Sequence, residues 1–256
     1  MTLQFQNSNI YYSAKGTGNP LVLLHGFLES SKIWEPFIAR LAVKRQVVCI
    51  DLPGHGRSGI IGEVHSMELM AEVVKAVLDH LKISSATILG HSMGGYVTLA
   101  FCEKYPQNTS GIILLNSTPQ KDTPEKILNR DRSIAVVKRN KKAYVNAAIS
   151  GLVAPGNNIK YKPEIEVLKE AAARFPTTGI IAALKGMKIR TNKVEVLKNF
   201  NKLKIMIIGE NDSVLPYSEM VNVAKECKCK LFRMSGGHLS YMENITEIDN
   251  FMHFID

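Results

Sequence analysis

The sequence predicts an α/β fold in which a mostly parallel β-sheet is covered by helices on both faces. Short apolar runs rich in Val, Ile and Leu alternate along the chain with amphipathic segments of helical period. Because a βαβ unit joins two parallel strands through a helix, this alternation is typical of a parallel sheet. The 256 residues are enough to bury a large core, in one domain or in two smaller ones.

Apolar runs bounded by polar or glycine-rich turns predict the strands of this sheet. They lie at residues 2–6, 10–14, 21–24, 46–50, 86–89, 112–115, 203–208 and 229–233, with a turn at 7–9 between the first two. Apolar side chains at helical spacing predict the helices. These lie at residues 34–41, 67–81 with Ser66 as N-cap, 93–104 and 216–226, followed by a last helix that places Ile248, Phe251 and Ile255 on one face.

Residues 118–195 depart from this alternation. Their helical period continues without a convincing strand, and five prolines interrupt it. The pattern predicts a helical insertion between two strands, which must lean on the sheet to bury its apolar faces. Residues 1–117 and 196–256 are then predicted to form the core that carries the sheet.

The overall composition is that of a soluble globular protein, with 45% hydrophobic and 21% charged residues. No apolar run approaches the roughly 18 residues that a membrane-spanning helix needs. The first residues have neither the basic start nor the apolar stretch of a signal peptide. The sequence therefore predicts a cytoplasmic protein, although a mature chain without its leader would look the same.

Positive charge is concentrated in one part of the chain. The net charge is +9, and residues 119–195 contain 16 Lys and Arg against 7 Asp and Glu, so the rest of the chain is balanced. A solvated helical surface is the ordinary interpretation. Attraction of an anionic substrate or of an acidic surface is the alternative. Nucleic acid is not predicted as a partner, because the segment has few aromatic residues among its charges and no known reader motif.

The four cysteines indicate neither a disulfide nor a metal site. Cys49 lies in a predicted strand and Cys102 in a predicted helix, where a cysteine is usually a small buried apolar residue. Cys227 and Cys229 are too close together for a redox or zinc pair, and no His/Cys cluster completes them. We therefore predict no disulfide and no structural metal.

Ser92 has the strongest indication of chemistry, because it stands in the motif Gly-His-Ser-Met-Gly-Gly at residues 90–95. A predicted strand precedes the motif and a predicted helix follows it. The chain would reverse sharply at the serine and project its hydroxyl from the top of the sheet. Glycine is needed on both sides, since a Cβ there would collide with the neighbouring strand or helix. The pattern predicts a nucleophile elbow, and a plain glycine-containing turn is the alternative.

A serine nucleophile also needs N–H groups that stabilise an oxyanion. One donor is expected at the backbone N–H of Met93, the residue after the nucleophile. The second is expected at Phe27, which ends the run His-Gly-Phe directly after the predicted strand 21–24. The alternative for this run is an ordinary strand-to-helix turn.

A carboxylate and a histidine complete the predicted site. Asp212 lies three residues after the glycine that ends an apolar strand, and its carboxylate would orient an imidazole. Helix capping or an Asx turn is the alternative role, and Glu210 is the competing carboxylate. His238 follows two glycines in a loop before the last helix. The chain order Ser92, Asp212, His238 is the order expected after such an elbow.

The remaining six histidines have weaker claims to a catalytic role. His25 and His91 flank the backbone of the expected oxyanion pocket and are interpreted as structural. His55 belongs to a turn. The histidines interpreted as surface or helix positions are His65, His80 and His253.

Together these motifs resemble those of the α/β-hydrolase superfamily over almost the full length of the chain. The matching stretches are residues 16–27, 51–58, 90–95, 209–216 and 236–238. The resemblance implies the α/β-hydrolase fold, with an eight-stranded, mostly parallel sheet flanked by helices and residues 118–195 as a helical cap. A serine nucleophile in place of aspartate separates the chain from haloalkane dehalogenases and epoxide hydrolases. Asn244 departs from the pattern, because a proline is usual there.

The resemblance implies a carboxylesterase-like serine hydrolase of small to medium esters, without metal or organic cofactor. It would form an acyl-enzyme on Ser92, with Asp212 and His238 completing the triad. One alternative is a carbon–carbon hydrolase, an enol-lactonase or a menaquinone-pathway-type lyase on the same triad. The lyase typically carries an arginine near the position of Tyr96. The other alternative is a small-molecule receptor or signalling module that retains the triad.

Overall fold

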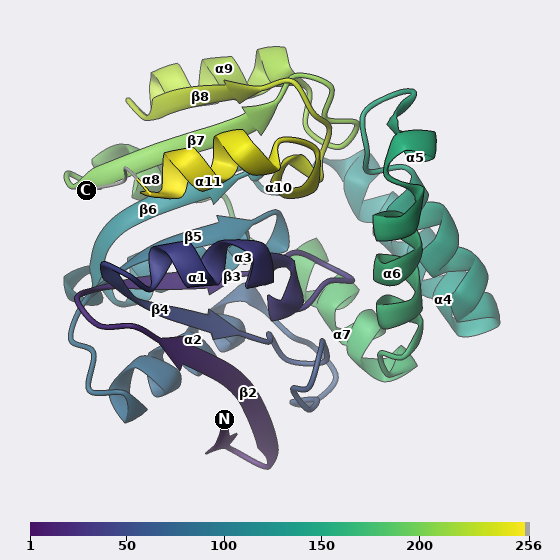
Figure 1. Cartoon of the computed structure of the whole chain (residues 1–256). Coiled ribbons are helices and arrows are strands. Elements are labelled where there is room, and N and C mark those ends of the chain that lie inside the picture. Colours follow the sequence, from purple (N-terminus) through teal and green to yellow (C-terminus); the bar gives the residue numbers. More distant parts are fainter. Residues whose placement is uncertain (254–256) are drawn as a thin grey trace.

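The computed structural model describes residues 1–253 and contains an eight-stranded sheet in the order β1-β2-β4-β3-β5-β6-β7-β8 (Figure 1). The first two pairs, β1 with β2 and β2 with β4, are antiparallel, and every other pair is parallel. The predicted mostly parallel sheet is therefore confirmed. The strands are β1 (Thr2–Phe5), β2 (Ser8–Lys15), β3 (Asn19–Leu24), β4 (Arg45–Ile50), β5 (Ala86–His91), β6 (Thr109–Leu115), β7 (Leu203–Gly209) and β8 (Lys230–Met234).

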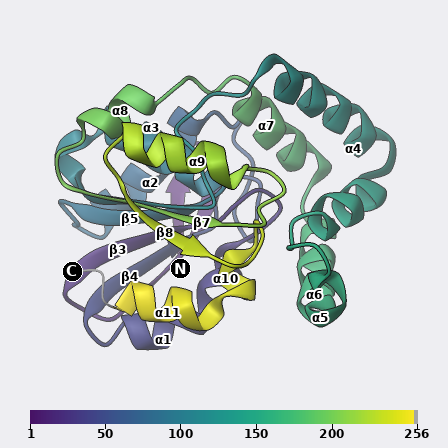
Figure 2. The ribbon, with the colours of Figure 1, turned by 90° about the horizontal axis from the view of Figure 1, so that it is seen from above.

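Helices cover both faces of this sheet. Figure 2 shows α1 and α11 on one face and α2, α3 and α9 on the other. This arrangement explains why the central strands are apolar without alternation: each of their faces is covered. The helices are α1 (Glu35–Leu41), α2 (Met67–His80), α3 (Met93–Lys104), α9 (Tyr217–Glu226) and α11 (Ile245–His253), with short turns η1 (Ser31–Trp34), η2 (Pro106–Asn108) and α10 (Ser240–Glu243).

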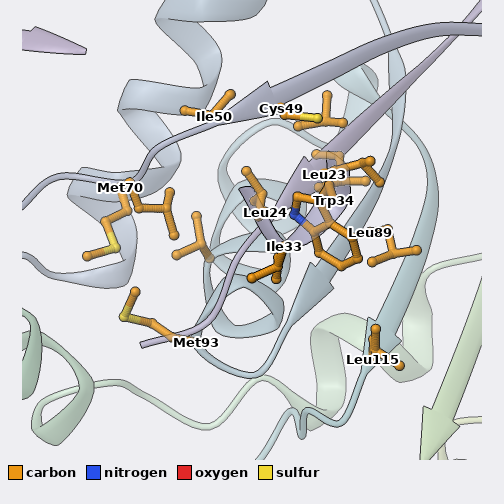
Figure 3. Packing of buried hydrophobic residues seen from close by; sticks show 14 of the residues in the cluster. Leu23, Leu24, Ile33, Trp34, Cys49, Ile50, Met70, Leu89, Met93 and Leu115 are labelled. Carbon is orange, nitrogen blue, oxygen red and sulfur yellow. The ribbon is translucent and has the colours of Figure 1, made fainter. Parts of the chain in front are cut away.

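The central strand β3 shows how the core is built. Its last four side chains, residues 21–24, are fully buried. Trp34, at the end of η1, lies beside Leu23 and Leu89 in the same buried cluster (Figure 3). The Trp34 ring also packs against Tyr241 of α10, with 6.2 Å between ring centroids. Burial of large side chains such as these contributes about 1.5–3 kcal/mol each.

The segment between β6 and β7 is helical, and residues 118–195 contain no strand. In Figures 1 and 2 its helices α4 to α7 lie beyond the carboxyl ends of the parallel strands. Contacts with the core hold it there: the His65 N–H donates to the carbonyl oxygen of Ala182 in α7 (3.0 Å). The helices of the segment are α4 (Pro124–Ser150), α5 (Asn157–Lys160), α6 (Lys162–Ala173), α7 (Thr177–Lys188) and α8 (Val194–Asn199).

Helix α4 is interrupted at Asn140, whose φ of −155° and ψ of 84° are not helical. The Asn140 side chain accepts a hydrogen bond from the Ala143 N–H (3.0 Å), as an N-cap does. The residue therefore ends one helical stretch and begins the next, so that α4 is kinked at this point.

Some predicted boundaries differ from the structure. The first turn lies at Gln6 and Asn7, where Gln6 adopts a φ of 50°, and Ser8 already belongs to β2. Several strands extend beyond the predicted apolar run because backbone pairing continues into polar residues. The predicted contribution of Ile255 to the last helix lies outside the described residues. Within the described chain, no helix is both long and apolar enough to cross a membrane.

Candidate active site

Ser92 occupies the turn between β5 and α3 in a conformation that few residues adopt. Its φ is 49° and its ψ is −113°. Such a conformation costs about 1–3 kcal/mol and persists only where the surroundings hold it. Here the Ser92 N–H donates to the Leu115 carbonyl (3.0 Å), and its carbonyl accepts from the Ser117 hydroxyl (2.7 Å). The strained backbone directs the Ser92 side chain out of the sheet.

The two motif glycines permit this close packing, as the sequence predicts. A Cβ at Gly90 would lie 2.2 Å from the carbonyl oxygen of Gly94 in α3. A Cβ at Gly94 would lie 2.5 Å from the Leu24 carbonyl oxygen at the end of β3. Both distances are well inside van der Waals contact with backbone atoms that cannot move aside. Only glycine fits at either position.

The structure brings Ser92, His238 and Asp212 together at the carboxyl edge of the sheet. His238 Nε2 lies 2.8 Å from Ser92 Oγ, and His238 Nδ1 lies 2.8 Å from Asp212 Oδ2. Asp212 follows β7 and His238 follows β8, so neighbouring parallel strands carry the two side chains to the same edge. The Asp212 carboxylate accepts the Nδ1–H, which leaves Nε2 free to accept a proton from the serine.

Asp212 is buried and fully hydrogen-bonded. Its Oδ1 accepts from the N–H groups of Val214 (2.8 Å) and Leu215 (3.0 Å), while its Oδ2 also accepts from Asn116 Nδ2 (2.9 Å). Burial acts to raise the pKa of Asp212, but the charge and hydrogen bond of His238 and the other donors outweigh it and lower the pKa. The carboxylate therefore stays ionised. It forms the Asx-type turn and holds His238 at the same time.

Asn116 is a member of the site that sequence reasoning missed. It follows β6 with a φ of 45°, and its side chain donates both to Asp212 and to the Gly237 carbonyl (3.1 Å). Asn244, at the position where the resemblance led us to expect proline, accepts from the Gly236 N–H (2.8 Å). The two asparagines thus fix the loop that carries the histidine. The available signal was an Asn directly after a buried strand, at the same edge as the other groups.

The two residues expected to supply oxyanion donors come from the elbow and from the loop after β3. Met93 is the first residue of α3, where N–H groups have no partner within the helix. Phe27 lines the same cavity as Ser92. Its loop is held by a hydrogen bond from the Gly26 N–H to Glu29 Oε2 (2.6 Å). Within residues 1–253, the Phe27 N–H donates to no backbone carbonyl in a turn or loop.

A buried Glu29–His91 pair lies directly behind these groups. His91 Nδ1 is 2.9 Å from Glu29 Oε2, and His91 Nε2 donates to the His238 carbonyl (2.9 Å). Glu29 also accepts from the Tyr241 hydroxyl (3.0 Å). Burial acts against both charges, yet their mutual attraction and hydrogen bonds lower the pKa of Glu29 and raise that of His91. The charged pair joins the Phe27 loop, the elbow and the His238 backbone, a role that the sequence did not indicate for Glu29.

Three further histidines are buried and neutral. His25 Nε2 accepts from the Leu52 N–H (2.9 Å), and His65 Nε2 accepts from the Ile61 N–H (3.1 Å). Burial lowers the pKa of His25, that of His55 to about 3 and that of His65 to about 4. The interpretation of His65 as a surface or helix residue is wrong, because α7 packs over the loop that holds it.

The site opens into a cavity of about 190 Å³ between the sheet edge and helices α4 and α7. Most of its wall is apolar or aromatic, and one guanidinium group, that of Arg130 in α4, reaches it. Sequence reasoning did not single out this arginine. The lining residues are Phe27, Leu28, His91, Ser92, Tyr96, Arg130, Tyr144, Ala148, Leu152, Met187, Val214 and His238.

Outside this site, the cysteines of β4 and α3 are buried and favour the unreactive thiol form. Cys49 in β4 and Cys102 in α3 are buried, and burial raises their thiol pKa values to about 12 and about 11. In the described part of the chain, no group of three His, Cys, Asp or Glu side chains is placed to hold a metal ion.

Comparisons with known proteins agree with this architecture. A family model described as the alpha/beta hydrolase fold matches residues 19–148. A putative non-heme haloperoxidase of a Mycobacterium phage is 26% identical over 239 residues, covering 88% of this chain and 83% of that protein. Some other relatives are matched over only 27% to 42% of their own length.

Solved structures with the same fold are also similar to the chain. A thermophilic esterase from Thermogutta terrifontis, solved with malate bound, has a TM-score of 0.91 at 27% identity, covering 98% of this chain and 94% of that one. The enol-lactonase of Burkholderia xenovorans has a TM-score of 0.90 at 16% identity, covering 98% and 97%. At that identity the second likeness concerns the fold alone.

Proposed function

The chain belongs to the α/β-hydrolase fold family, and from that membership we propose that it hydrolyses small to medium carboxylic esters through an acyl-enzyme on Ser92. The observation that carries the proposal is the hydrogen-bonded series of Ser92, His238 and Asp212, with both links at 2.8 Å. This series ends in a cavity that a small acyl group can enter. The esterase from Thermogutta terrifontis adds support as a relative of the same fold.

In the acylation step, Ser92 Oγ attacks the carbonyl carbon of the ester while His238 Nε2 takes the hydroxyl proton. The imidazole becomes positively charged in this step. Asp212 remains ionised beside Nδ1 and stabilises that charge. The C–O bond to the alcohol then breaks, and the leaving oxygen receives from His238 the proton that came from Ser92.

The oxyanion formed on the carbonyl oxygen would be held by the N–H groups of Phe27 and Met93. Such donors are fixed by the fold before the substrate arrives, so they need no reorganisation during the reaction. Each contributes about 10²–10³-fold to turnover in comparable sites. The α3 N-terminus adds a partial positive charge on the same side.

In the deacylation step, a water molecule attacks the acyl carbon and His238 accepts one of its protons. The bond between the acyl carbon and Ser92 Oγ breaks, and the serine recovers its proton from His238. The products are the carboxylic acid and a free enzyme. We propose that residues 118–195 act as a cap, because α4 and α7 contribute Arg130, Tyr144, Ala148 and Met187 to the wall of the cavity that contains Ser92.

Substitution of Ser92 by alanine tests this function. The variant should fold normally and lose 4-nitrophenyl acetate turnover by about 10⁴-fold or more, because the acyl-enzyme cannot form. Ser110→Ala is the matched control: this exposed serine lies at the opposite end of β6, and its loss should leave turnover unchanged. Turnover that persists in Ser92→Ala would refute the assignment. A wild-type protein that hydrolyses no ester but gains thermal stability from a small ligand would instead favour a receptor.

A further inference from the structure

Arg130 brings a positive charge to the wall of the cavity that contains Ser92 and His238. It lies in the second turn of α4, and its side chain is 19% exposed. Among the described lining residues there is no aspartate or glutamate, so nothing in the wall itself neutralises the guanidinium. A charge so placed costs free energy unless a partner compensates it.

The partner within the protein, Asp122, is shared by two arginines. Arg130 Nε and Nη2 both donate to the Asp122 carboxylate, and Arg190 Nη1 lies 2.7 Å from Asp122 Oδ1. The Asp122 side chain is 1% exposed. One carboxylate thus faces two guanidinium groups, and the buried cluster has a net charge of +1. It lies in the segment that holds all of the excess positive charge of the chain.

The two arginines differ in their position relative to the cavity. Arg190 does not line it: its guanidinium stacks on the Tyr96 ring at 4.0 Å, Nη1 donates to the Met187 carbonyl (3.0 Å), and its buried Nε has no hydrogen-bond partner within residues 1–253. Arg130 Nη1 meets only the Met187 sulfur at 3.5 Å within residues 1–253, and a thioether is a weak acceptor. Arg130 therefore retains donor capacity on the side of the cavity.

Tyr144 lies in the same wall. Burial raises the pKa of its phenol, and its hydroxyl is already hydrogen-bonded to the Ser133 side chain. The guanidinium edge of Arg130 suits an oxygen anion, and a carboxylate matches its planar geometry best. The surrounding lining is apolar and would accommodate the carbon chain that links such a carboxylate to the reacting ester.

We propose that Arg130 binds a carboxylate of the substrate, so that the enzyme prefers esters carrying a carboxylate a few bonds from the scissile carbonyl. This inference rests on the ester hydrolysis proposed above. The competing explanation is that Arg130 only joins α4 to Asp122 and so holds the entry and exit of the helical segment together. That role predicts that a change of Arg130 lowers kcat/KM by the same factor for anionic and neutral esters.

Matched substrate pairs distinguish the two explanations. Monoethyl succinate is compared with ethyl levulinate, which replaces the carboxylate by a methyl ketone on the acyl side. 4-Acetoxybutyrate is compared with 5-acetoxypentan-2-one, which does the same on the alcohol side. Turnover is followed by titration of the released acid. We expect wild-type kcat/KM to favour the anionic member of at least one pair by about tenfold or more.

Three variants then test whether Arg130 causes the preference for the anionic ester. Arg130→Gln should lower kcat/KM for the preferred anion by about 100-fold and for its neutral partner by less than about threefold. Arg130→Lys should restore part of the preference, because it restores the charge without the planar fork. Arg190→Gln is the control: it breaks the same Asp122 cluster from outside the cavity and should keep the preference.

Several results would overturn the proposal. The first is that wild-type kcat/KM shows no preference in either pair. The second is that Arg130→Gln lowers kcat/KM equally for the anionic and the neutral ester. The third is that Arg190→Gln loses the preference as fully as Arg130→Gln does. If neutral esters are still hydrolysed, such results leave the proposed function standing and remove only the role of Arg130. If no ester is hydrolysed, calorimetric binding of both anionic probes to Ser92→Ala decides: binding that Arg130→Gln abolishes supports the site, and its absence refutes it.

Discussion

Replacement of Asp212 by asparagine tests the hydrogen bonding of the site most sharply. The native carboxylate accepts four hydrogen bonds and donates none. Its Oδ2 faces His238 Nδ1 and Asn116 Nδ2, and its Oδ1 faces two backbone N–H groups, those of residues 214 and 215. Asparagine has one oxygen and one NH2 group, so in either orientation its NH2 group faces two donors.

The orientation that keeps the two backbone bonds places the NH2 group against the His238 ring. The ring must then accept at Nδ1 and carry its proton on Nε2, where it can no longer take the proton of Ser92. A wrong tautomer of this kind costs about 10⁴-fold in turnover. This corresponds to about 5.5 kcal/mol of activation free energy, since each tenfold is about 1.36 kcal/mol. The opposite orientation leaves two backbone donors unpaired and should cost about 1–3 kcal/mol of stability for each.

The assay is the initial rate with 4-nitrophenyl acetate at neutral pH, with circular dichroism to verify folding. Glu210→Gln makes the same carboxylate-to-amide change two residues away. Glu210 is exposed and pairs with Arg233 (3.1 Å) at the surface, so its change should alter turnover by less than about twofold. An Asp212→Asn variant that retains more than about a tenth of the activity would refute the assigned role of Asp212.

Two further predictions concern stability. Glu29→Gln removes one charge of the buried pair with His91, so the free energy of unfolding at neutral pH should fall by about 3–5 kcal/mol in chemical denaturation; a change below about 1 kcal/mol would contradict the ion pair. His55 and His65 have lowered pKa values, about 3 and about 4 against 6.5, so the unfolded chain takes up protons first as the pH falls. Their stabilisation is complete above pH 6.5 and is lost below it, by about 2 kcal/mol in total between about pH 6 and about pH 5. The lowered pKa of His25 acts in the same direction over this window, the raised pKa of His91 acts above it, and the lowered pKa values of Glu29 and Asp212 act below it. Denaturation curves that do not change over the window would contradict the burial of these histidines.

The sequence was sufficient where a local pattern encodes the structure. The run of apolar residues at 21–24 predicted a strand buried on both faces, because no side of it could face water. The elbow around Ser92 could be predicted because its glycines are demanded by backbone contacts within a few residues. His238 could be located by its order in the chain and by the glycines that precede it.

The sequence was insufficient where a residue acts through a partner far along the chain. Glu29 and His91 are 62 positions apart, and nothing local indicates that they pair. Asn116 meets Asp212 only because β6 and β7 are neighbours in the sheet. Arg130 was one of many basic residues in its segment until the path of α4 placed it in the cavity wall.

Mass spectrometry after treatment with a fluorophosphonate probe tests the central claim most directly, because the probe bonds only to a serine that its neighbours have activated. We expect one adduct per chain, on the peptide that contains Ser92, and loss of labelling in His238→Ala. A wild-type chain that stays unlabelled, or that carries its adduct on another residue, would contradict the account.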